Sequence, residues 1–322
     1  FLWPASRGAP SKRVRYSSTR ASSAPRRRRP TATQRGHTMA AGSLLIPPHL
    51  FGQSGKHKHP ICAFVKFLQE MSFEELAATI KRLGFDGIEG TVRPGGHVPP
   101  ERVEEDLPKL MQALRTHDVD MTIMASGINR ADDPLSEKTL RLASKLGVKR
   151  YRMSYYKYDL KKSVIDQIAN FKSMAKELAA LNRELGMQAI YQNHAGDRYL
   201  GGTIWDLREL LKGIPREHMA VGFDIRHAKA EAGMSWPVYW NVIQPHVGAV
   251  YVKDFRWEEG KLVNVPLGDG WVNDRFFTPE RLNGFEGPIS LHVEYLQRAG
   301  LEPNTNALEK DLATLRHWIK SS

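Results

Sequence analysis

Residues 221–228 have the sequence VGFDIRHA, in which an apolar run ends abruptly in three polar side chains. The run predicts a buried strand, with Asp224, Arg226 and His227 at its C-terminal end. A carboxylate, a guanidinium and an imidazole this close together can form part of a site for a metal ion or a polar substrate. A surface turn would also explain them, because charged residues are common in loops. The choice depends on whether other strands end in the same way.

Strand-like and helix-like segments alternate from residue 61 to the C-terminus. The β-rich runs predict strands at 61–65, 87–89, 121–124, 150–153, 189–192, 221–224, 249–254 and 289–294. Helical patterns predict helices at 72–83, 100–117, 136–146, 161–184, 204–211, 235–243, 279–282 and 306–319. Eight strands and eight helical segments in about 260 residues are typical of one α/β domain folded as a (β/α)8 barrel, the TIM barrel.

Local signals support this division into elements. Ser72 followed by Glu75 predicts a capping box at the start of the first helix. Leu-Gly pairs precede three of the expected strands and are typical of a left-handed glycine that ends a helix; they are Leu83-Gly84, Leu146-Gly147 and Leu185-Gly186. An open doubly wound sheet is the main alternative, but no glycine-rich fingerprint follows the first expected strand.

Most of the other expected strands also end in polar residues, which a closed barrel would bring together on one face. These residues are Lys66, Glu89, Arg93, His97, Arg152, Gln192, Asn193, His194, Asp224, Arg226, His227, Lys253, Asp254, His292 and Glu294. Asp224, Glu294 and a nearby imidazole would suit a divalent cation. The basic residues are either counterions of the carboxylates or contacts for a phosphate or a developing enolate. The tyrosines at positions 155, 156 and 158 either stack on a sugar or pack a loop onto the barrel.

The positive charge of the chain is concentrated in its N-terminal extension. The formal net charge is +12, but residues 1–58 contain 12 Lys and Arg and no acidic residue, which leaves 35 basic and 35 acidic residues in 59–322. A neutral barrel argues against nucleic acid as a partner. Because residues 1–38 are rich in Arg, Ser, Pro and Thr, we expect disorder there. The expected organisation is a disordered basic extension over 1–58 and a barrel over 59–322.

Part of this extension has the layout of an export signal. Four arginines at 26–29 precede the mildly apolar segment 39–51, although Pro47 and Pro48 interrupt it. A twin-arginine signal and an extension without function are both open, and with them an exported, periplasmic location and a cytoplasmic one. No stretch approaches the roughly 20 apolar residues of a membrane span. The single cysteine, Cys62, is expected in the core.

The chain contains the phrases VRPGGHV at 92–98, YQNHAG at 191–196, FDIRHA at 223–228, VKDF at 252–255 and GPISLHVEY at 287–295. Together they resemble the sugar phosphate isomerase/epimerase family, with its xylose isomerase-like TIM barrel, over roughly residues 59–320. The resemblance implies one divalent metal ion (Mn, Mg, Zn or Co) held by a Glu, an Asp, a His and a Glu on strands five to eight. It puts Asp224 on strand six and Glu294 on strand eight, and makes His227 a substrate contact.

Two positions depart from this pattern. Gln192 stands where the strand-five Glu is expected, and Tyr251 where the strand-seven His is expected. A Gln can bind a metal through its oxygen but cannot accept a proton at neutral pH. His194 or Lys253 could supply the missing acid or base, and His194 could instead replace a metal ligand. The predicted metal ligands are Asp224, Glu294, Gln192 and His194, and the predicted catalytic residues are Glu294, His194 and Lys253.

The resemblance implies a metal-dependent sugar, sugar phosphate or keto-sugar isomerase or epimerase, with Glu294 abstracting a proton next to a carbonyl group. An eliminating lyase or hydratase on a keto-sugar or glycoside is an alternative, and so is a sugar-binding barrel without chemistry. A repair endonuclease of a related barrel type is disfavoured by the neutral charge. The expected partners are a small-molecule sugar and, in a homo-oligomer, further copies of the chain. The predicted substrate contacts are Lys66, Glu89, Arg93, His97, Arg152, Asn193, Arg226, His227 and His292.

Overall fold

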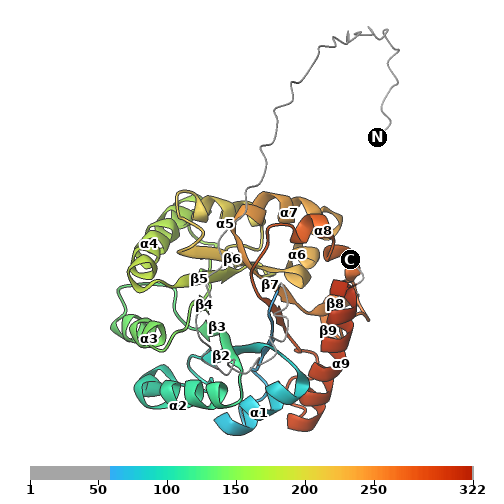
Figure 1. The fold of residues 1–322 in the computed structure, drawn as a ribbon. Helices are drawn as coiled ribbons and strands as arrows, with labels where there is room; N and C mark the ends of the chain where they lie inside the picture. Colours follow the sequence, from blue (N-terminus) through green and yellow to red (C-terminus); the bar gives the residue numbers. More distant parts are fainter. Residues whose placement is uncertain (1–58, 321–322) are drawn as a thin grey trace, which may run out of the picture. The chain divides into compact units, whose positions relative to one another are not determined.

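The structure is a computed structural model that describes residues 59–320, in which eight parallel strands close into a barrel with helices around it (Figure 1). The order around the barrel is β1 (Ile61–Phe64), β2 (Gly87–Val92), β3 (Asp120–Ser126), β4 (Arg150–Arg152), β5 (Gln188–Gln192), β6 (Met219–Asp224), β7 (Val247–Val252) and β10 (Ile289–Leu291). The TIM barrel prediction is confirmed. The disorder and the export signal predicted before residue 59 lie outside the described residues.

Helices follow the strands and cover the outside of the barrel (Figure 1). They are α1 (Phe73–Leu83), α2 (Val103–Thr116), α3 (Pro134–Lys145), α4 (Val164–Leu185), α5 (Ile204–Leu211), α6 (Ile225–Ala232), α7 (Trp236–Ile243), α8 (Pro279–Leu282) and α9 (Leu301–Lys320). Short 3-10 turns occupy Pro100–Arg102, Gly233–Ser235, Gln244–His246 and Asp274–Phe276. None of the helices within 59–320 combines the length and the apolar character needed to cross a membrane.

The expected helix signals work as predicted. The Ser72 hydroxyl accepts a hydrogen bond from the backbone N–H of Glu75, and the Glu75 carboxylate accepts one from the backbone N–H of Ser72. Gly84, Gly147 and Gly186 all adopt positive φ angles, of 86°, 94° and 62°. These values confirm that each Leu-Gly pair ends a helix before the next strand begins.

One helix and one hairpin of two strands were not expected from the sequence. Helix α6 begins directly after β6, and Asp224 is its N-cap, because the carboxylate accepts a hydrogen bond from the backbone N–H of His227. A hairpin of β8 (Asp254–Glu258) and β9 (Lys261–Val265) follows β7, where the sequence predicted a strand continuing through residue 254. The Asp254 carboxylate accepts hydrogen bonds from three backbone N–H groups of the next loop, those of Gly268, Gly270 and Val272. Asp254 therefore orders a loop.

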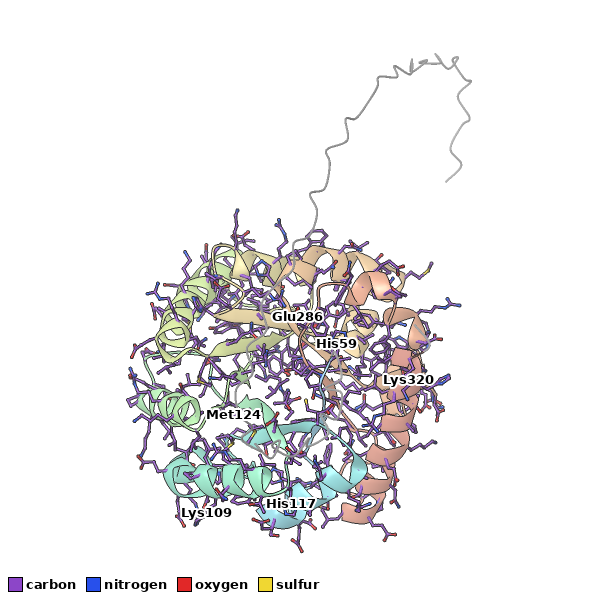
Figure 2. All side chains as sticks on the ribbon, in the orientation of Figure 1. His59, Lys109, His117, Met124, Glu286 and Lys320 are labelled. Atoms are coloured by element: carbon purple, nitrogen blue, oxygen red, sulfur yellow. The ribbon has the colours of Figure 1, made fainter. Side chains whose placement is uncertain are left out.

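A cluster of buried apolar residues lies inside the barrel and consists of Cys62, Ile123, Ile190, Ala220, Ala249 and Tyr251. Figure 2 shows the side chains packed between the strands and the surrounding helices. The prediction that Cys62 is a core residue is confirmed, since its side chain is fully buried. Tyr251 also lies in this interior, and its ring crosses Gly222 on the neighbouring strand β6. A Cβ atom on Gly222 would lie 2.1 Å from Cε2 of Tyr251 and 2.8 Å from Cγ2 of Ile190. The strand therefore needs a glycine at this position.

We expect Gly222→Ala to lower the free energy of unfolding by about 1–3 kcal/mol, because the added methyl group overpacks the barrel interior. Urea unfolding followed by circular dichroism measures the change. Gly127→Ala is the matched control, since a Cβ atom there would meet no heavy atom closer than 3.7 Å. Equal midpoints for the two variants would contradict this account, and Gly222→Ala/Tyr251→Leu should recover part of the loss.

Candidate active site

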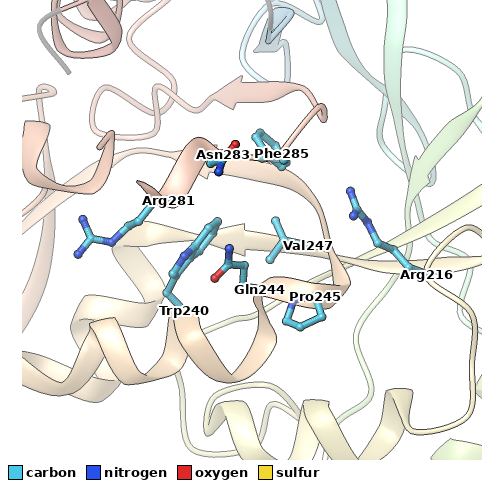
Figure 3. A pocket seen from close by; sticks show the side chains of 9 residues that line it. Arg216, Trp240, Gln244, Pro245, Val247, Arg281, Asn283 and Phe285 are labelled. Carbon is cyan, nitrogen blue, oxygen red and sulfur yellow. The ribbon is translucent and has the colours of Figure 1, made fainter. Parts of the chain in front are cut away.

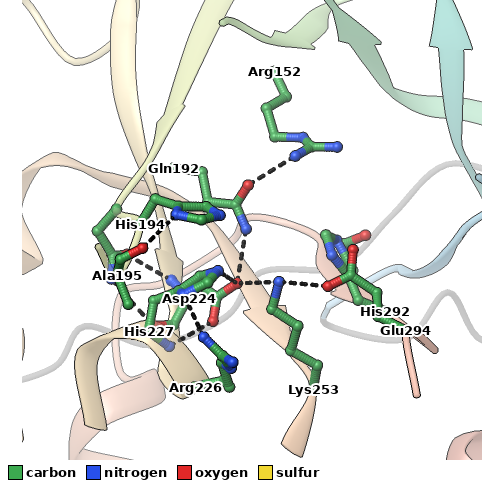
Figure 4. A network of polar contacts seen from close by, with 12 residues as sticks. Arg152, Gln192, His194, Ala195, Asp224, Arg226, His227, Lys253, His292 and Glu294 are labelled. Carbon is green, nitrogen blue, oxygen red and sulfur yellow. Dashed lines mark hydrogen bonds and ion pairs between the residues drawn. The ribbon is translucent and has the colours of Figure 1, made fainter. Parts of the chain in front are cut away.

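The polar residues predicted at the strand ends gather at the C-terminal end of the barrel. Side chains alternate along each strand, so that on β7 and just after it Tyr251 and Lys253 point inward while Val250 and Val252 face the helices. A network of hydrogen bonds and ion pairs joins five of them in a row: Arg152, Gln192, Asp224, Lys253 and Glu294 (Figure 4). These five residues are brought together only when the strands that carry them close into the barrel.

Glu89 is a fully buried carboxylate at one side of this network. Its Oε2 accepts hydrogen bonds from Ser290 Oγ at 2.6 Å and from Nε2 of His292 at 2.8 Å, and its Oε1 forms an ion pair with Arg152. Burial by itself raises the pKa of Glu89, but the charges of Arg152 and His292 outweigh it and lower the pKa to about 2. Glu89 is therefore ionised and held by protein partners.

Gln192 connects Arg152 with Asp224, and its partners fix the orientation of its amide. The Gln192 oxygen accepts hydrogen bonds from Nη1 of Arg152 at 2.8 Å and from the Tyr155 hydroxyl at 2.7 Å. Its Nε2 donates to Oδ2 of Asp224 at 2.7 Å. An arginine can only donate and a carboxylate can only accept, so the opposite orientation would lose both contacts. The Gln192 group that faces Asp224 is thus a donor.

Lys253 lies between two carboxylates. Its Nζ is 2.9 Å from Oε2 of Glu294 and 3.4 Å from Oδ2 of Asp224 (Figure 4). Burial alone lowers the pKa of Lys253, but Asp224 and Glu294 outweigh it, so that the pKa is raised and the group is cationic. The pKa of Glu294 is well below its usual range, because Lys253 and His292 outweigh the opposite effect of burial.

His227 is buried beside Asp224, and its neighbours determine which ring nitrogen carries the proton. Nδ1 lies 3.0 Å from Nη1 of Arg226, which can only donate, so Nδ1 accepts and Nε2 carries the proton. Burial, with Lys253 as the next cause, holds the pKa of His227 well below its usual value, so the ring is neutral. Nε2 has no hydrogen-bond partner among the described residues. Nε2 is itself buried and lies 3.6 Å from Oδ2 of Asp224, so this carboxylate is its nearest acidic neighbour.

His194 packs against His227 with ring centroids 4.0 Å apart, and it has the opposite tautomer. Its Nδ1 donates to the backbone oxygen of Ala195 at 2.8 Å, so Nε2 carries a lone pair. Burial lowers the pKa of His194 to about 4, with Lys253 as the next cause. The rings of Tyr155 and Tyr199 also contact His194, with centroids 4.9 and 4.3 Å away. The site thus contains one neutral imidazole that can accept a proton and one that can donate.

Several predicted substrate contacts are engaged by the protein itself. Both ring nitrogens of His97 have partners within the protein. Nδ1 is bonded to the Thr91 hydroxyl and Nε2 to the Leu68 carbonyl oxygen, so His97 connects the loop after β2 with the loop after β1. The Asn193 side chain exchanges two hydrogen bonds with the backbone of Asp224. Glu89, Arg152 and His292 form the ion-pair cluster described above.

Two predicted basic contacts lie at the edge of the cluster. Lys66 is exposed, and Arg93 is partly buried with its guanidinium 5.7 Å from the ring centre of Phe64. Their charges interact with the site. Burial and Arg152 lower the pKa of Arg93 despite Glu89, and burial, Arg93 and Lys253 lower the pKa of Lys66 despite Glu294. Both side chains remain accessible to a ligand.

The sequence did not identify Tyr155, Tyr199 and Ser290 as site residues. The sequence predicted that the tyrosines at 155, 156 and 158 either stack on a sugar or pack a loop onto the barrel. Tyr156 and Tyr158 pack against Phe171 of α4, whereas the Tyr155 hydroxyl donates a hydrogen bond to Gln192. Ser290 lies on β10 two residues before His292, which follows the strand, and could have been found by that spacing. Tyr199 lies in a loop and carries no comparable signal.

The predicted metal ligands do not form a metal site in this arrangement. No group of three or more His, Cys, Asp or Glu residues within 59–320 is placed to hold a metal ion. Gln192 presents an amide N–H to Asp224, and Lys253 occupies the space between Asp224 and Glu294. Tyr251 contributes only a neutral phenol, buried without a hydrogen-bond partner among the described residues. The donor set does not fit a divalent cation.

A cavity of about 210 Å³ lies at the opposite end of the barrel (Figure 3). It adjoins Val247, the first residue of β7, and is lined by Trp240, Gln244, Arg216 and Arg281 among others. None of the predicted site residues lines this cavity. The network around Asp224 and Lys253 is therefore the candidate active site.

Comparisons with solved structures show the same fold. The chain resembles D-psicose 3-epimerase with D-tagatose from Clostridium cellulolyticum H10 (13% identity, TM-score 0.62, covering 80% of this chain and 98% of that one). It resembles the probable 3-DHS dehydratase from Bacillus anthracis (11%, 0.61, 80% and 98%). It also resembles a xylose isomerase-like TIM barrel protein from Mycobacterium smegmatis in complex with magnesium (16%, 0.59, 81% and 97%).

The sequence comparisons decide the family. No curated protein matches the chain. The model of the xylose isomerase-like TIM barrel family matches residues 77–320, which is most of the chain and nearly all of the barrel. The solved structures of the same fold named above include an epimerase and a probable dehydratase. This chain belongs to the xylose isomerase-like TIM barrel family.

Proposed function

We propose that this barrel is a sugar-directed isomerase or epimerase that moves a proton at the carbon next to a carbonyl group. The observation that carries the proposal is the pair of neutral imidazoles of His194 and His227, which pack against each other with ring centroids 4.0 Å apart and have opposite tautomers fixed by protein partners. Such a pair provides one proton acceptor and one proton donor at neutral pH. The solved structure of a related epimerase with D-tagatose supports a sugar as the substrate class.

In this proposal Nε2 of His194 removes the proton from the carbon, and Nε2–H of His227 donates to the carbonyl oxygen as negative charge develops there. The Lys253 ammonium stabilises that charge. Isomerisation results if His194 returns that proton to the former carbonyl carbon while the proton of the neighbouring hydroxyl group passes to the enediolate oxygen. Epimerisation instead requires a proton donor on the opposite face of the substrate. No step requires a metal ion, because the donor set does not fit one.

Glu294, predicted as the base, is less suited to that role than His194. Its ion pair with Lys253 at 2.9 Å holds its pKa well below the usual range, despite burial. The pKa of His194 is also lowered, to about 4, but that of Glu294 is lower still, so its carboxylate is the weaker acceptor for a proton on carbon. We therefore propose that Glu294 orients the Lys253 ammonium.

An eliminating lyase or hydratase is the second candidate. The base His194 and the acid His227 lie on one side of the site. This arrangement suits an elimination in which the proton and the leaving group depart from the same face of the substrate. The resemblance to a probable 3-DHS dehydratase favours it at the level of the family. The two candidates share the first step, proton abstraction by His194.

Proton NMR in deuterated buffer tests the proposal with a panel of aldoses, ketoses and 3-keto-glycosides. We expect at least one sugar to lose the signal of a C–H next to its carbonyl as solvent deuterium enters. A new sugar with an intact carbon chain would indicate an isomerase or epimerase, and an unsaturated product a lyase. Saturable binding without exchange across the panel would contradict both and favour a sugar-binding barrel.

A further inference from the structure

We propose that the ammonium group of Lys253 is the built-in cation of this site and takes the place of a divalent metal ion between Asp224 and Glu294. That Lys253 replaces a bound metal ion does not depend on the proposed function. Only the catalytic use of the Lys253 ammonium rests on the proposed function. It separates this chain from the magnesium-bound relative of the same fold.

The first argument is position. Nζ contacts Oδ2 of Asp224 and Oε2 of Glu294, the two carboxylates best placed to hold a metal ion at these strand ends. The Lys253 side chain is 6% exposed, and that of Asp224 is fully buried. An ammonium held between two anions in so enclosed a space cannot be displaced outward without leaving buried charges unpaired.

The second argument comes from the remaining oxygen contacts of Asp224. Oδ1 accepts the backbone N–H of His227 at 3.0 Å, and Oδ2 accepts the Gln192 amide at 2.7 Å in addition to its contact with Lys253. Each of these partners is a donor, so a metal ion would have to displace N–H groups that already occupy both oxygens of Asp224. Gln192 cannot rotate to offer its oxygen, because Arg152 and Tyr155 hold that oxygen.

The third argument is the charge of the surroundings. Arg152, Arg226 and Lys253 are all buried at the site, and Lys66 and Arg93 lie at its edge. These five cations outnumber the three carboxylates Glu89, Asp224 and Glu294. A further doubly charged cation would be repelled, whereas an anionic or enolate-like group is favoured.

An ammonium can replace one part of the action of a metal ion. Its N–H groups and its charge can stabilise a developing oxyanion. Unlike a bound metal ion, it stays in place when a chelator is added, and it cannot hold several substrate oxygens in a fixed coordination geometry. The structure thus assigns the electrostatic role to a covalently attached group.

Manganese binding tests the inference on the full chain. We expect the wild-type protein, treated with EDTA and dialysed, to leave the electron paramagnetic resonance signal of added Mn²⁺ unchanged, with no shift in its melting temperature. The double variant Gln192→Glu/Lys253→Ala removes the ammonium and adds a carboxylate beside Asp224 and Glu294. It should bind Mn²⁺ at least about tenfold more tightly than the wild type and melt at a higher temperature when Mn²⁺ is present.

Lys66→Ala is the control, because it removes a lysine at the same end of the barrel that does not lie between the carboxylates; it should gain no Mn²⁺ binding. Stoichiometric metal in the purified wild-type protein, or Mn²⁺ binding by the wild type that stabilises it, would overturn the inference. If the double variant does not fold, the Mn²⁺ titration of the wild-type protein by itself decides whether the site binds a metal ion. Absence of deuterium exchange in a metal-free wild type would count against the proposed function and leave the cation assignment intact.

Discussion

Replacing His194 by Gln is expected to lower the rate of solvent deuterium exchange by about 10²–10⁴-fold, the contribution typical of a general base. The glutamine amide can keep the hydrogen bond to the Ala195 carbonyl oxygen, but it cannot accept a proton. The loss should therefore fall on kcat, with a small change in KM. Initial rates by proton NMR at several concentrations of an active sugar measure both quantities.

His117→Gln is the matched control for this variant. His117 is a partly exposed histidine on the outside of the barrel that contacts Glu74, far along the chain from the strand ends. The control should exchange at the wild-type rate. If His194→Gln retained more than half of the wild-type rate while folded, the base would be another group.

The pH dependence of the exchange gives a second readout of the same residue. Because burial and Lys253 lower the pKa of His194 to about 4, the ring is a free base throughout the neutral range. Activity should be flat near neutral pH and fall as the pH decreases through about 4. Lys253→Met removes a nearby positive charge, so the acidic limb of its residual activity should move to higher pH.

Replacing Arg152 by Met is expected to lower the free energy of unfolding by about 3–5 kcal/mol, the cost of breaking a buried ion pair from one side. Glu89 would remain fully buried with its charge opposed only by His292 and Ser290, and Gln192 would lose one of its two donors. Urea unfolding of the full chain measures the loss. The double variant Glu89→Gln/Arg152→Met should recover much of it, since no buried charge is then left unpaired.

Arg141→Met is the control for this second variant. Arg141 pairs with Glu137 and Glu184 on the surface, where the side chains are 41–60% exposed. Surface pairs contribute about 1 kcal/mol or less. A similar loss in the Arg141 and Arg152 variants would show that the buried cluster has no special part in stability.

The ionisation of Glu89 also predicts how stability depends on pH. Its pKa is lowered from 4.5 to about 2 in the folded protein, where Arg152 and His292 outweigh burial. A carboxyl group with a lowered folded pKa stabilises the protein above its ordinary pKa, and that stabilisation is lost as the pH falls from about 4.5 to about 2. In Glu89→Gln this part of the acid transition should be absent.

The elements that the sequence missed share one cause. Asp224 ends β6 and also caps α6, so one polar residue serves two elements and a pattern read along the chain shows only the strand end. The β8–β9 hairpin follows β7 after a single residue, and its mixed polar pattern merges with the strand before it. Boundaries of this kind depend on where hydrogen-bond partners lie in space.

The sequence by itself determined the barrel and the set of polar residues at one of its ends. Alternating strand and helix patterns, glycine stops and polar strand ends are local features, and each acts within a few residues. They predicted the TIM barrel, which the structure confirms. They also named most of the residues that form the network.

Only the tertiary structure decided what those residues present to one another. The Gln192 amide is oriented by Arg152, 40 residues away, and Lys253 is paired with Glu294, 41 residues away. The tautomers of His194 and His227 follow from Ala195 and Arg226, but only the packing of the two rings against each other brings an acceptor and a donor together. Hydrogen bonding and charge depend on distances between residues remote in the chain, and those distances exist only in the folded barrel.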